Sequence, residues 1–354
     1  MRTTLSRLIT GGFILAFAGC ASAQVAYVAD FSSNAVSVIN TTTNSVVATI
    51  NVPYPPLAIA VNPAGTLAWV TYSGAGEISA INTAGNTVAA TFPSGFDPWA
   101  VAFSPNGSIA WVANAGSNSV WAMNTSTNTA AAKISVGNNP EGIALNPAGT
   151  LVYASNFNDG TVSAINTSSN TVIATIPVGN SPYGIAFHPS GAFAYVANQN
   201  SGTVSVISAA TNTVTASIPV GNGPVAVSFN GAGTRAYVAN LYGNSVSVID
   251  PSSNTVIQTV PVGQRPNGVA VNPAGTFAYV TNGLDGTVSA INTATYAVSA
   301  PIGVGAGPAG IAIGPAAGSS PAPTPAPSTI LLLLTGLLSI VGWQRLRPRL
   351  CGPH

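Results

Sequence analysis

Short apolar runs that alternate with polar positions recur along the chain at a constant spacing. Runs typified by AYVAN begin at residues 26, 68, 110, 152, 194, 236 and 278. Runs typified by IAVNP begin at residues 59, 101, 143, 185, 227, 269 and 311. In both registers each run starts 42 residues after the previous one, so two independent patterns establish one internal repeat.

Each repeat contains four apolar runs rich in Val, Ile, Thr and Tyr. In the fourth repeat they are EGIALNP, TLVYASN, TVSAINT and TVIATIPVG. Their near-alternation predicts strands, and the Asn-, Gly- and Pro-rich segments between them (146–150, 165–170 and 179–182) predict tight turns. Four short strands in about 40 residues, repeated seven times, predict an all-β fold: a seven-bladed β-propeller of four-stranded antiparallel blades.

The repeat is permuted relative to the blade. The body of the chain begins with a second strand (26–29) and ends with an isolated first strand (309–313). We expect strand 309–313 to join the N-terminal blade and close the ring, because closure removes exposed sheet edges. The expected propeller domain is 24–315. One large ring per repeat is expected to pack between blades: Tyr27, Trp69, Trp111, Tyr153, Tyr195, Tyr237 and Tyr279.

The recurring Tyr-Val-Ala/Thr-Asn motif resembles that of the YVTN β-propeller family. The resemblance covers about residues 25–315, which is most of the chain. It implies a propeller like those of archaeal and bacterial surface and envelope proteins and of some periplasmic factors. It implies no catalytic motif, since propellers carry many unrelated functions.

The N-terminal segment has the composition of a signal peptide. In residues 1–23, Arg2 and Arg7 precede an apolar stretch (8–17), and the small residues Ala21 and Ala23 occupy the two recognition positions before the expected cleavage site, which precedes Gln24. We therefore expect export through the inner membrane. An alternative is lipidation at Cys20, since the sequence FAGC resembles a lipoprotein box.

The C-terminal segment is expected to be a second targeting signal. A Pro/Ala-rich linker (316–329) precedes an apolar stretch (330–343) and an Arg-rich tail that completes segment 330–354. This order resembles the PEP-CTERM sorting signal, with Ala326 where that family has Glu. The resemblance implies cutting by a transpeptidase-like sorting protease, and a location in the envelope, outer surface or extracellular matrix of a Gram-negative bacterium. The alternative is a plain membrane anchor through residues 330–343.

Charge is scarce and excludes one class of partner. Charged residues make up 4% of the chain, against about 25% in typical soluble proteins. Outside the two end segments only Lys133, Arg235 and Arg265 are basic, while seven acids lie between Asp30 and Asp285. A nucleic-acid binder needs a basic stripe, so no nucleic-acid partner is expected.

The body offers little for catalysis or metal binding. Its one histidine, His188, lies in a predicted turn, and both cysteines lie in the end segments. We therefore predict no catalytic residues, no metal site, no cofactor and no structural disulfide.

The repeats differ most at the positions that should surround one mouth of the central channel. One set follows the proline at the start of each first strand, and it contains Leu57, Trp99, Glu141, Tyr183, Val225, Asn267 and Ala309. Residues just before that proline and residues between second and third strands should crowd the same face. The predicted ligand- or partner-binding residues are Asp97, Trp99, Glu141, Tyr183, Arg265, Asn267, Phe157, Asp159 and Tyr242. The alternative is that these loop tips vary without function.

Three functions are consistent with these features. The first is an envelope or extracellular propeller that binds or displays protein or polysaccharide partners, because aromatic residues beside amides and carboxylates suit sugar recognition. The second is a propeller hydrolase of the lactonase type, for which Asp97, Glu141 and Arg265 are the candidate residues. The third is a periplasmic assembly factor for a redox enzyme.

Overall fold

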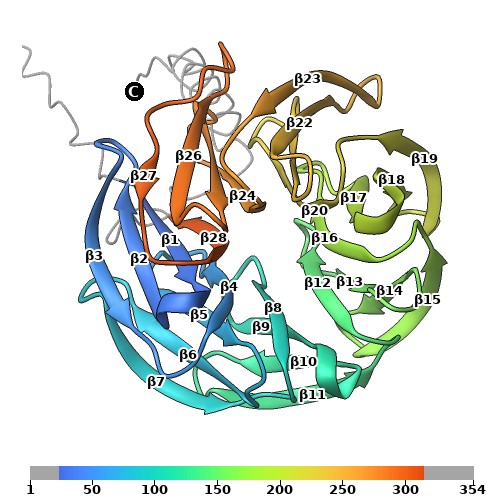
Figure 1. Cartoon of the computed structure of the whole chain (residues 1–354). Coiled ribbons are helices and arrows are strands. Elements are labelled where there is room, and N and C mark those ends of the chain that lie inside the picture. Colours follow the sequence, from blue (N-terminus) through green and yellow to red (C-terminus); the bar gives the residue numbers. More distant parts are fainter. Residues whose placement is uncertain (1–23, 315–354) are drawn as a thin grey trace, which may run out of the picture. The chain divides into compact units, whose positions relative to one another are not determined.

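A computed structural model describes residues 24–314, which form a closed ring of seven four-stranded antiparallel sheets (Figure 1). The predicted seven-bladed, all-β propeller is therefore confirmed. The expected signal peptide (1–23), linker (316–329) and C-terminal segment (330–354) lie outside the described residues. Among the described residues no helix is long and apolar enough to cross a membrane.

The four strands of a blade follow one another outward from the central axis, where the innermost strands face each other (Figure 1). The innermost strands are β28 (Pro308–Gly314), β4 (Pro56–Val61), β8 (Pro98–Phe103), β12 (Pro140–Leu145), β16 (Pro182–Phe187), β20 (Pro224–Phe229) and β24 (Pro266–Val271). The second strands are β1 (Val25–Asp30), β5 (Leu67–Tyr72), β9 (Ile109–Asn114), β13 (Leu151–Asn156), β17 (Phe193–Asn198), β21 (Ala236–Asn240) and β25 (Phe277–Asn282).

The two outer positions of each blade complete the sheets. The third strands are β2 (Ala35–Asn40), β6 (Glu77–Asn82), β10 (Ser119–Asn124), β14 (Thr161–Asn166), β18 (Thr203–Ser208), β22 (Ser245–Asp250) and β26 (Thr287–Asn292). The outermost strands are β3 (Ser45–Asn51), β7 (Thr87–Pro93), β11 (Thr129–Ser135), β15 (Thr171–Pro177), β19 (Thr213–Pro219), β23 (Thr255–Pro261) and β27 (Ile302–Gly303). Short 3-10 turns follow three second strands: η1 (Phe31–Ser33), η2 (Ala115–Ser117) and η3 (Gln199–Ser201).

Both ends of the described chain meet in one blade. Strand β28 pairs antiparallel with β1, with Val25 opposite Gly314 and Tyr27 opposite Ala312. The sheet order is β28-β1-β2-β3, so the first strand of this blade comes from the far end of the propeller sequence. This is the closure that the isolated strand 309–313 predicted, extended by one residue at each end.

The core lies between neighbouring blades rather than in one central mass. One cluster, for example, joins Tyr153 and Ile176 of the β12–β15 blade to Ile185 and Ile207 of the β16–β19 blade. All seven aromatic residues of the AYVAN-type motif are at most 2% exposed, as the packing prediction requires. Each sheet thus buries its faces only against its two neighbours.

Glycine in the innermost strands lets neighbouring blades approach each other at the axis. A Cβ atom on Gly268 would lie 2.7 Å from the carbonyl oxygen of Ala309, and one on Gly310 would lie 2.7 Å from that of Leu57. No side chain fits in these places without moving backbone. The narrow spacing at the axis brings the residues at the start of each innermost strand close together.

One blade departs from the repeat. Strand β27 has only two residues, whereas the other outermost strands have seven. Pro301 lies in the middle of the segment that should form this strand, and proline has no N–H to donate to β26. An isolated bridge between Ile291 and Val298 is what remains of the pairing before Pro301.

Candidate functional site

Each innermost strand begins in the same way, and this fixes which side chains reach the axis. A proline starts the strand, and in six blades the residue before it has a positive φ: Asp97, Asn139, Ser181, Gly223, Arg265 and Gly307. This left-handed turn redirects the chain from the outermost strand of one blade to the axis. The residue after the proline then faces the channel.

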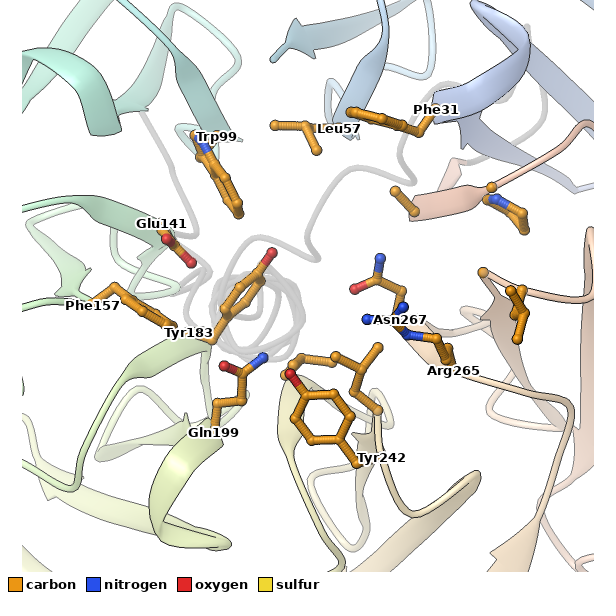
Figure 2. A pocket seen from close by; sticks show the side chains of 17 residues that line it. Phe31, Leu57, Trp99, Glu141, Phe157, Tyr183, Gln199, Tyr242, Arg265 and Asn267 are labelled. Carbon is orange, nitrogen blue, oxygen red and sulfur yellow. The ribbon is translucent and has the colours of Figure 1, made fainter. Parts of the chain in front are cut away.

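The seven residues after these prolines surround one cavity of about 530 Å³, which we call the mouth cavity (Figure 2). It is lined by Phe31, Leu57, Trp99, Glu141, Phe157, Tyr183, Gln199, Val225, Leu241, Tyr242, Arg265, Asn267, Gly283, Leu284, Gly307, Pro308 and Ala309. A second hollow of about 250 Å³ continues along the innermost strands and shares the same seven residues. The volume of the mouth cavity falls in the usual range of small-molecule sites.

The structure brings together seven of the nine predicted binding residues. Those that line the mouth cavity are Trp99, Glu141, Phe157, Tyr183, Tyr242, Arg265 and Asn267. Asp97 and Asp159 lie beside the cavity without lining it. Gln199 and Leu284 line it although the sequence analysis did not select them. Gln199 occupies the repeat position of Phe157, 42 residues earlier, so the repeat carried the signal for it.

Glu141 is a buried carboxyl group facing the cavity. Its side chain is 6% exposed, and its Oε1 accepts a hydrogen bond of 2.5 Å from Asn139 Nδ2. Its Oε2 has no hydrogen-bond partner among the described residues. Burial raises the pKa of Glu141 from 4.5 to about 8, with the Asn139 hydrogen bond opposing and the Asp97 charge adding to the shift. At neutral pH this group is therefore mainly the uncharged carboxylic acid, which can donate a hydrogen bond.

Aromatic rings line the cavity next to Glu141. The centroids of Trp99 and Tyr183 are 5.8 Å apart, and those of Tyr183 and Phe157 are 6.2 Å apart, both edge to face. Burial, with a smaller contribution from Glu141, raises the pKa of Tyr183, so its hydroxyl stays protonated. The Tyr183 ring extends towards the middle of the cavity (Figure 2).

Asp97 positions one of these rings. Its Oδ2 accepts a hydrogen bond of 3.0 Å from Trp99 Nε1, and its Oδ1 accepts one of 2.7 Å from the backbone N–H of Gly74. Asp97 therefore links the indole to the loop of the preceding blade. It acts on the cavity through Trp99.

Asp159 has a structural role between loops. Its Oδ2 accepts a hydrogen bond of 2.7 Å from the backbone N–H of Asn138, and its Oδ1 accepts one of 3.0 Å from Asn138 Nδ2. Asp285 makes the equivalent backbone contact with Gln264 at 2.6 Å. Asp159 lines a separate surface hollow, so it is part of the blade-to-blade connection instead of the mouth cavity.

The opposite side of the cavity carries its only cation. Arg265 and Asn267 lie across the cavity from Glu141 (Figure 2). Arg265 is exposed and forms no salt bridge with any described residue, since the one salt bridge found there joins Arg235 to Asp250. The cavity thus pairs an apolar, aromatic wall with a carboxylic acid on one side and a guanidinium and an amide on the other.

Other chemistry is sparse over residues 24–314. That region contains no group of three or more His, Cys, Asp or Glu side chains placed to hold a metal ion. His188 lies in a turn, where Nε2 is 2.9 Å from the carbonyl oxygen of Gly233 and the ring stacks on Phe193. The contact with Gly233 joins two neighbouring blades. None of these three residues lines the mouth cavity.

The comparisons with known proteins agree with this architecture. Residues 59–217 match the family model described as "Lactonase, 7-bladed beta-propeller". The matched segment includes Trp99, Glu141 and Tyr183, and it is less than half of the 354-residue chain. No curated protein sequence matches the chain.

Solved structures with the same fold come from proteins of different kinds. Hydrazine synthase of Kuenenia stuttgartiensis is 21% identical with a TM-score of 0.70, covering 75% of this chain and 91% of its own. A functionally unknown protein from Desulfotomaculum acetoxidans is 18% identical with a TM-score of 0.74, and the match covers 82% of this chain and 98% of that protein's chain. The dihydro-heme d1 dehydrogenase NirN is 13% identical with a TM-score of 0.61, and the match covers 81% of this chain and 74% of the NirN chain. At these identities the likeness concerns the fold alone.

Proposed function

We propose that this chain is an exported β-propeller that binds a glycan at its mouth cavity. The observation that carries the proposal is Glu141, whose Oε2 is buried, faces the cavity and has no partner among the described residues. Leaving a buried polar atom without a hydrogen bond costs about 1–3 kcal/mol. A ligand with a hydrogen-bond acceptor at this point would remove that cost.

The rest of the lining favours a sugar as that ligand. Trp99, Tyr183 and Tyr242 offer flat apolar faces, which match the C–H faces of a pyranose ring. Gln199 and Asn267 offer amide donors and acceptors at the rim, which match sugar hydroxyls. An apolar site with a few placed polar groups is the usual composition of a specific small-ligand pocket.

The two end segments support a proposed location for this protein in the cell. The proposal is that export delivers the propeller to the envelope or surface of a Gram-negative bacterium, and that residues 330–343 hold it in the membrane before any processing. There the mouth cavity would meet surface polysaccharide. Protein partners displayed on the same surface remain a second class of ligand.

An oligosaccharide array probed with purified protein tests this function. We expect saccharide binding by the native protein and by a control variant in which three exposed residues of outermost strands are replaced by alanine (Val47→Ala/Ile173→Ala/Ile257→Ala). We expect no binding by Trp99→Ala/Glu141→Ala/Tyr183→Ala, provided circular dichroism shows that it is folded. The proposal would be rejected if the native protein bound no saccharide on the array, or if the two triple variants bound equally well.

A hydrolase of the lactonase type is the second candidate. It is favoured by the family-model match over 59–217, and by a protonated carboxylic acid at Glu141 that could act as a general acid. Turnover of a lactone by the native protein, abolished in Glu141→Gln, would support it. The glutamine variant keeps the size and hydrogen-bonding groups of the side chain but removes its transferable proton, so binding alone should survive.

The third candidate, an assembly factor for a redox enzyme, has no specific feature of the mouth cavity in its favour. The fold likeness to hydrazine synthase and NirN concerns proteins at most 21% identical to this chain. It remains a prediction from the resemblance of the repeat motif.

A further inference from the structure

The mouth cavity has a charge character opposite to that of the propeller that surrounds it. Over residues 24–314 there are three basic and seven acidic residues, which gives a formal charge of −4. Among the lining residues, however, Arg265 is the only base and Glu141 the only acid. Because burial keeps Glu141 protonated at neutral pH, the lining carries one uncompensated positive charge.

The neighbouring carboxylates are all engaged elsewhere. Asp97 accepts hydrogen bonds from Trp99 and the Gly74 backbone, and Asp159 accepts them from Asn138. Asp285 accepts one from the backbone N–H of Gln264, the residue before Arg265. None of these three lines the cavity, and none is within salt-bridge distance of Arg265.

The backbone conformation at position 265 does not require an arginine. Its φ is 53°, in the left-handed region, and the same repeat position in the adjoining two blades holds Gly223 (φ 67°) and Gly307 (φ 66°). Three other blades have the short polar residues Asp97, Asn139 and Ser181 there, so Arg265 is the one long side chain among the six residues with this backbone conformation. A β-carbon in this conformation is unfavourable, whereas glycine adopts it without strain. A strained residue that carries the only cation of a cavity points to a role in that cavity.

From these observations, and resting on the proposed glycan function, we infer that the mouth cavity selects an acidic saccharide whose carboxylate is bound by Arg265 and Asn267. A guanidinium presents parallel N–H donors that match the two oxygens of a carboxylate, and the Asn267 amide can add one more. A single fork and an amide suit a singly charged uronate. The sugar ring would then lie against the aromatic wall, with Glu141 donating to a hydroxyl or ring oxygen on the far side.

The test compares uronic-acid oligosaccharides with their methyl esters, which keep the same sugar rings but replace each carboxylate by a neutral ester that is one methyl group larger. By isothermal titration calorimetry at low salt, we expect the native protein to bind the acid at least tenfold more tightly than the ester. In Arg265→Gly this preference should disappear while the melting temperature stays equal or rises. Arg265→Lys should keep a reduced preference, and the control Lys133→Gln, which removes a cation outside the mouth cavity, should keep all of it.

The outcomes separate this inference from the function on which it rests. Equal affinity of the native protein for acid and ester would overturn the role of Arg265 but leave a glycan-binding cavity. An unchanged preference in Arg265→Gly would assign the selection to another group. Failure to bind any oligosaccharide, acidic or neutral, would overturn both.

Discussion

Glu141 occupies a repeat position that holds Leu, Trp, Tyr, Val, Asn or Ala in the other six blades. The carboxyl group there is buried, lines the cavity together with Trp99 and Tyr183, and accepts a side-chain hydrogen bond only from Asn139 among the described residues. The ionised form of this buried carboxyl is unfavourable, so the folded protein loses stability when Glu141 ionises at higher pH. The other six blades have no carboxyl group at this position.

This loss of stability has a predictable pH dependence. The pKa of Glu141 is raised from 4.5 in the unfolded chain to about 8 in the fold. Below pH 4.5 the carboxyl is protonated in both states. Between 4.5 and 8 the unfolded chain loses the proton first, so the contribution to stability falls as pH rises, and above about 8 it stays at its lower value.

The Glu141→Gln variant should lack this decline. We expect it to be more stable than the native protein at pH 9, by at least about 1 kcal/mol, with the difference shrinking towards pH 4.5. Urea denaturation across that pH range measures it. Parallel stability curves for the two proteins would show that Glu141 ionises normally.

Asp30 offers a second test of the same physics. It replaces the Asn found at the end of five other second strands, is fully buried, and accepts a hydrogen bond of 2.6 Å from Ser37. Burial raises its pKa from 3.8 to about 6, opposed by hydrogen bonds from Ser37 and Gly305. Its contribution to stability therefore falls between pH 3.8 and 6, and Asp30→Asn should be about 1 kcal/mol more stable at pH 7 and not at pH 3.5. Thermal unfolding at the two pH values measures this difference, and an equal change at both would contradict it.

At the scale of elements, the hairpins between third and outermost strands connect neighbouring blades. Each hairpin ends on a residue with positive φ, which is Asn in six blades and Tyr296 in the last. The Tyr195 hydroxyl donates to Asn254 Oδ1 at 2.7 Å, and the Tyr153 hydroxyl donates to Asn212 Oδ1 at 2.7 Å. Because Tyr296 has no such acceptor, the buried hydroxyl of Tyr237 has no partner.

The same Tyr→Phe substitution should therefore change the stability of the protein differently in two adjacent blades. Tyr195→Phe removes a hydrogen bond and should destabilise the protein by about 1 kcal/mol. Tyr237→Phe removes only an unpaired hydroxyl and should be neutral or stabilising. Both rings are fully buried at the same place in adjacent blades, so packing effects cancel in the comparison. Equal losses in chemical denaturation would show that the Tyr–Asn contacts contribute nothing.

Strand β28 is the element on which ring closure depends. It supplies the innermost strand of the first blade and packs against its neighbours β4 and β24. A chain that ends at Gly307 should unfold at a much lower temperature than one that ends at Gly314, because it leaves β1 with an open edge and two blades without a neighbour at the axis. Calorimetry of the two truncated chains checks this, and equal melting temperatures would exclude a structural role for the closure.

At the scale of the whole molecule, the repeat made the fold predictable. A period of 42 residues, seen in two registers, determines the number of blades, the strand order and the closing strand. It also places the residues after each proline around one opening, since equivalent positions in a ring face the same axis. The shortened β27 was missed because a single Pro301 acts locally within an otherwise regular repeat.

The site was less predictable, because register does not determine side-chain direction. Asp159 was expected at the mouth, but its carboxylate is taken up by N–H groups of the preceding loop. Asp97 likewise binds Trp99 and Gly74. The burial of Glu141 depends on side chains from several blades at once, and its raised pKa follows only when those neighbours are in place.

The measurement that tests the central claim most directly is titration of an array-selected oligosaccharide at pH 7 into the native protein, Glu141→Gln and Glu141→Ala. If the mouth cavity is a binding site with Glu141 as a neutral donor, the affinity of Glu141→Gln for the oligosaccharide should lie within about threefold of that of the native protein. Glu141→Ala should bind the oligosaccharide at least about tenfold more weakly than the native protein, since about 1.4 kcal/mol of hydrogen-bond free energy is lost. The oligosaccharide should be recovered intact. Equal binding by all three proteins, or consumption of the ligand by the native protein alone, would contradict the account.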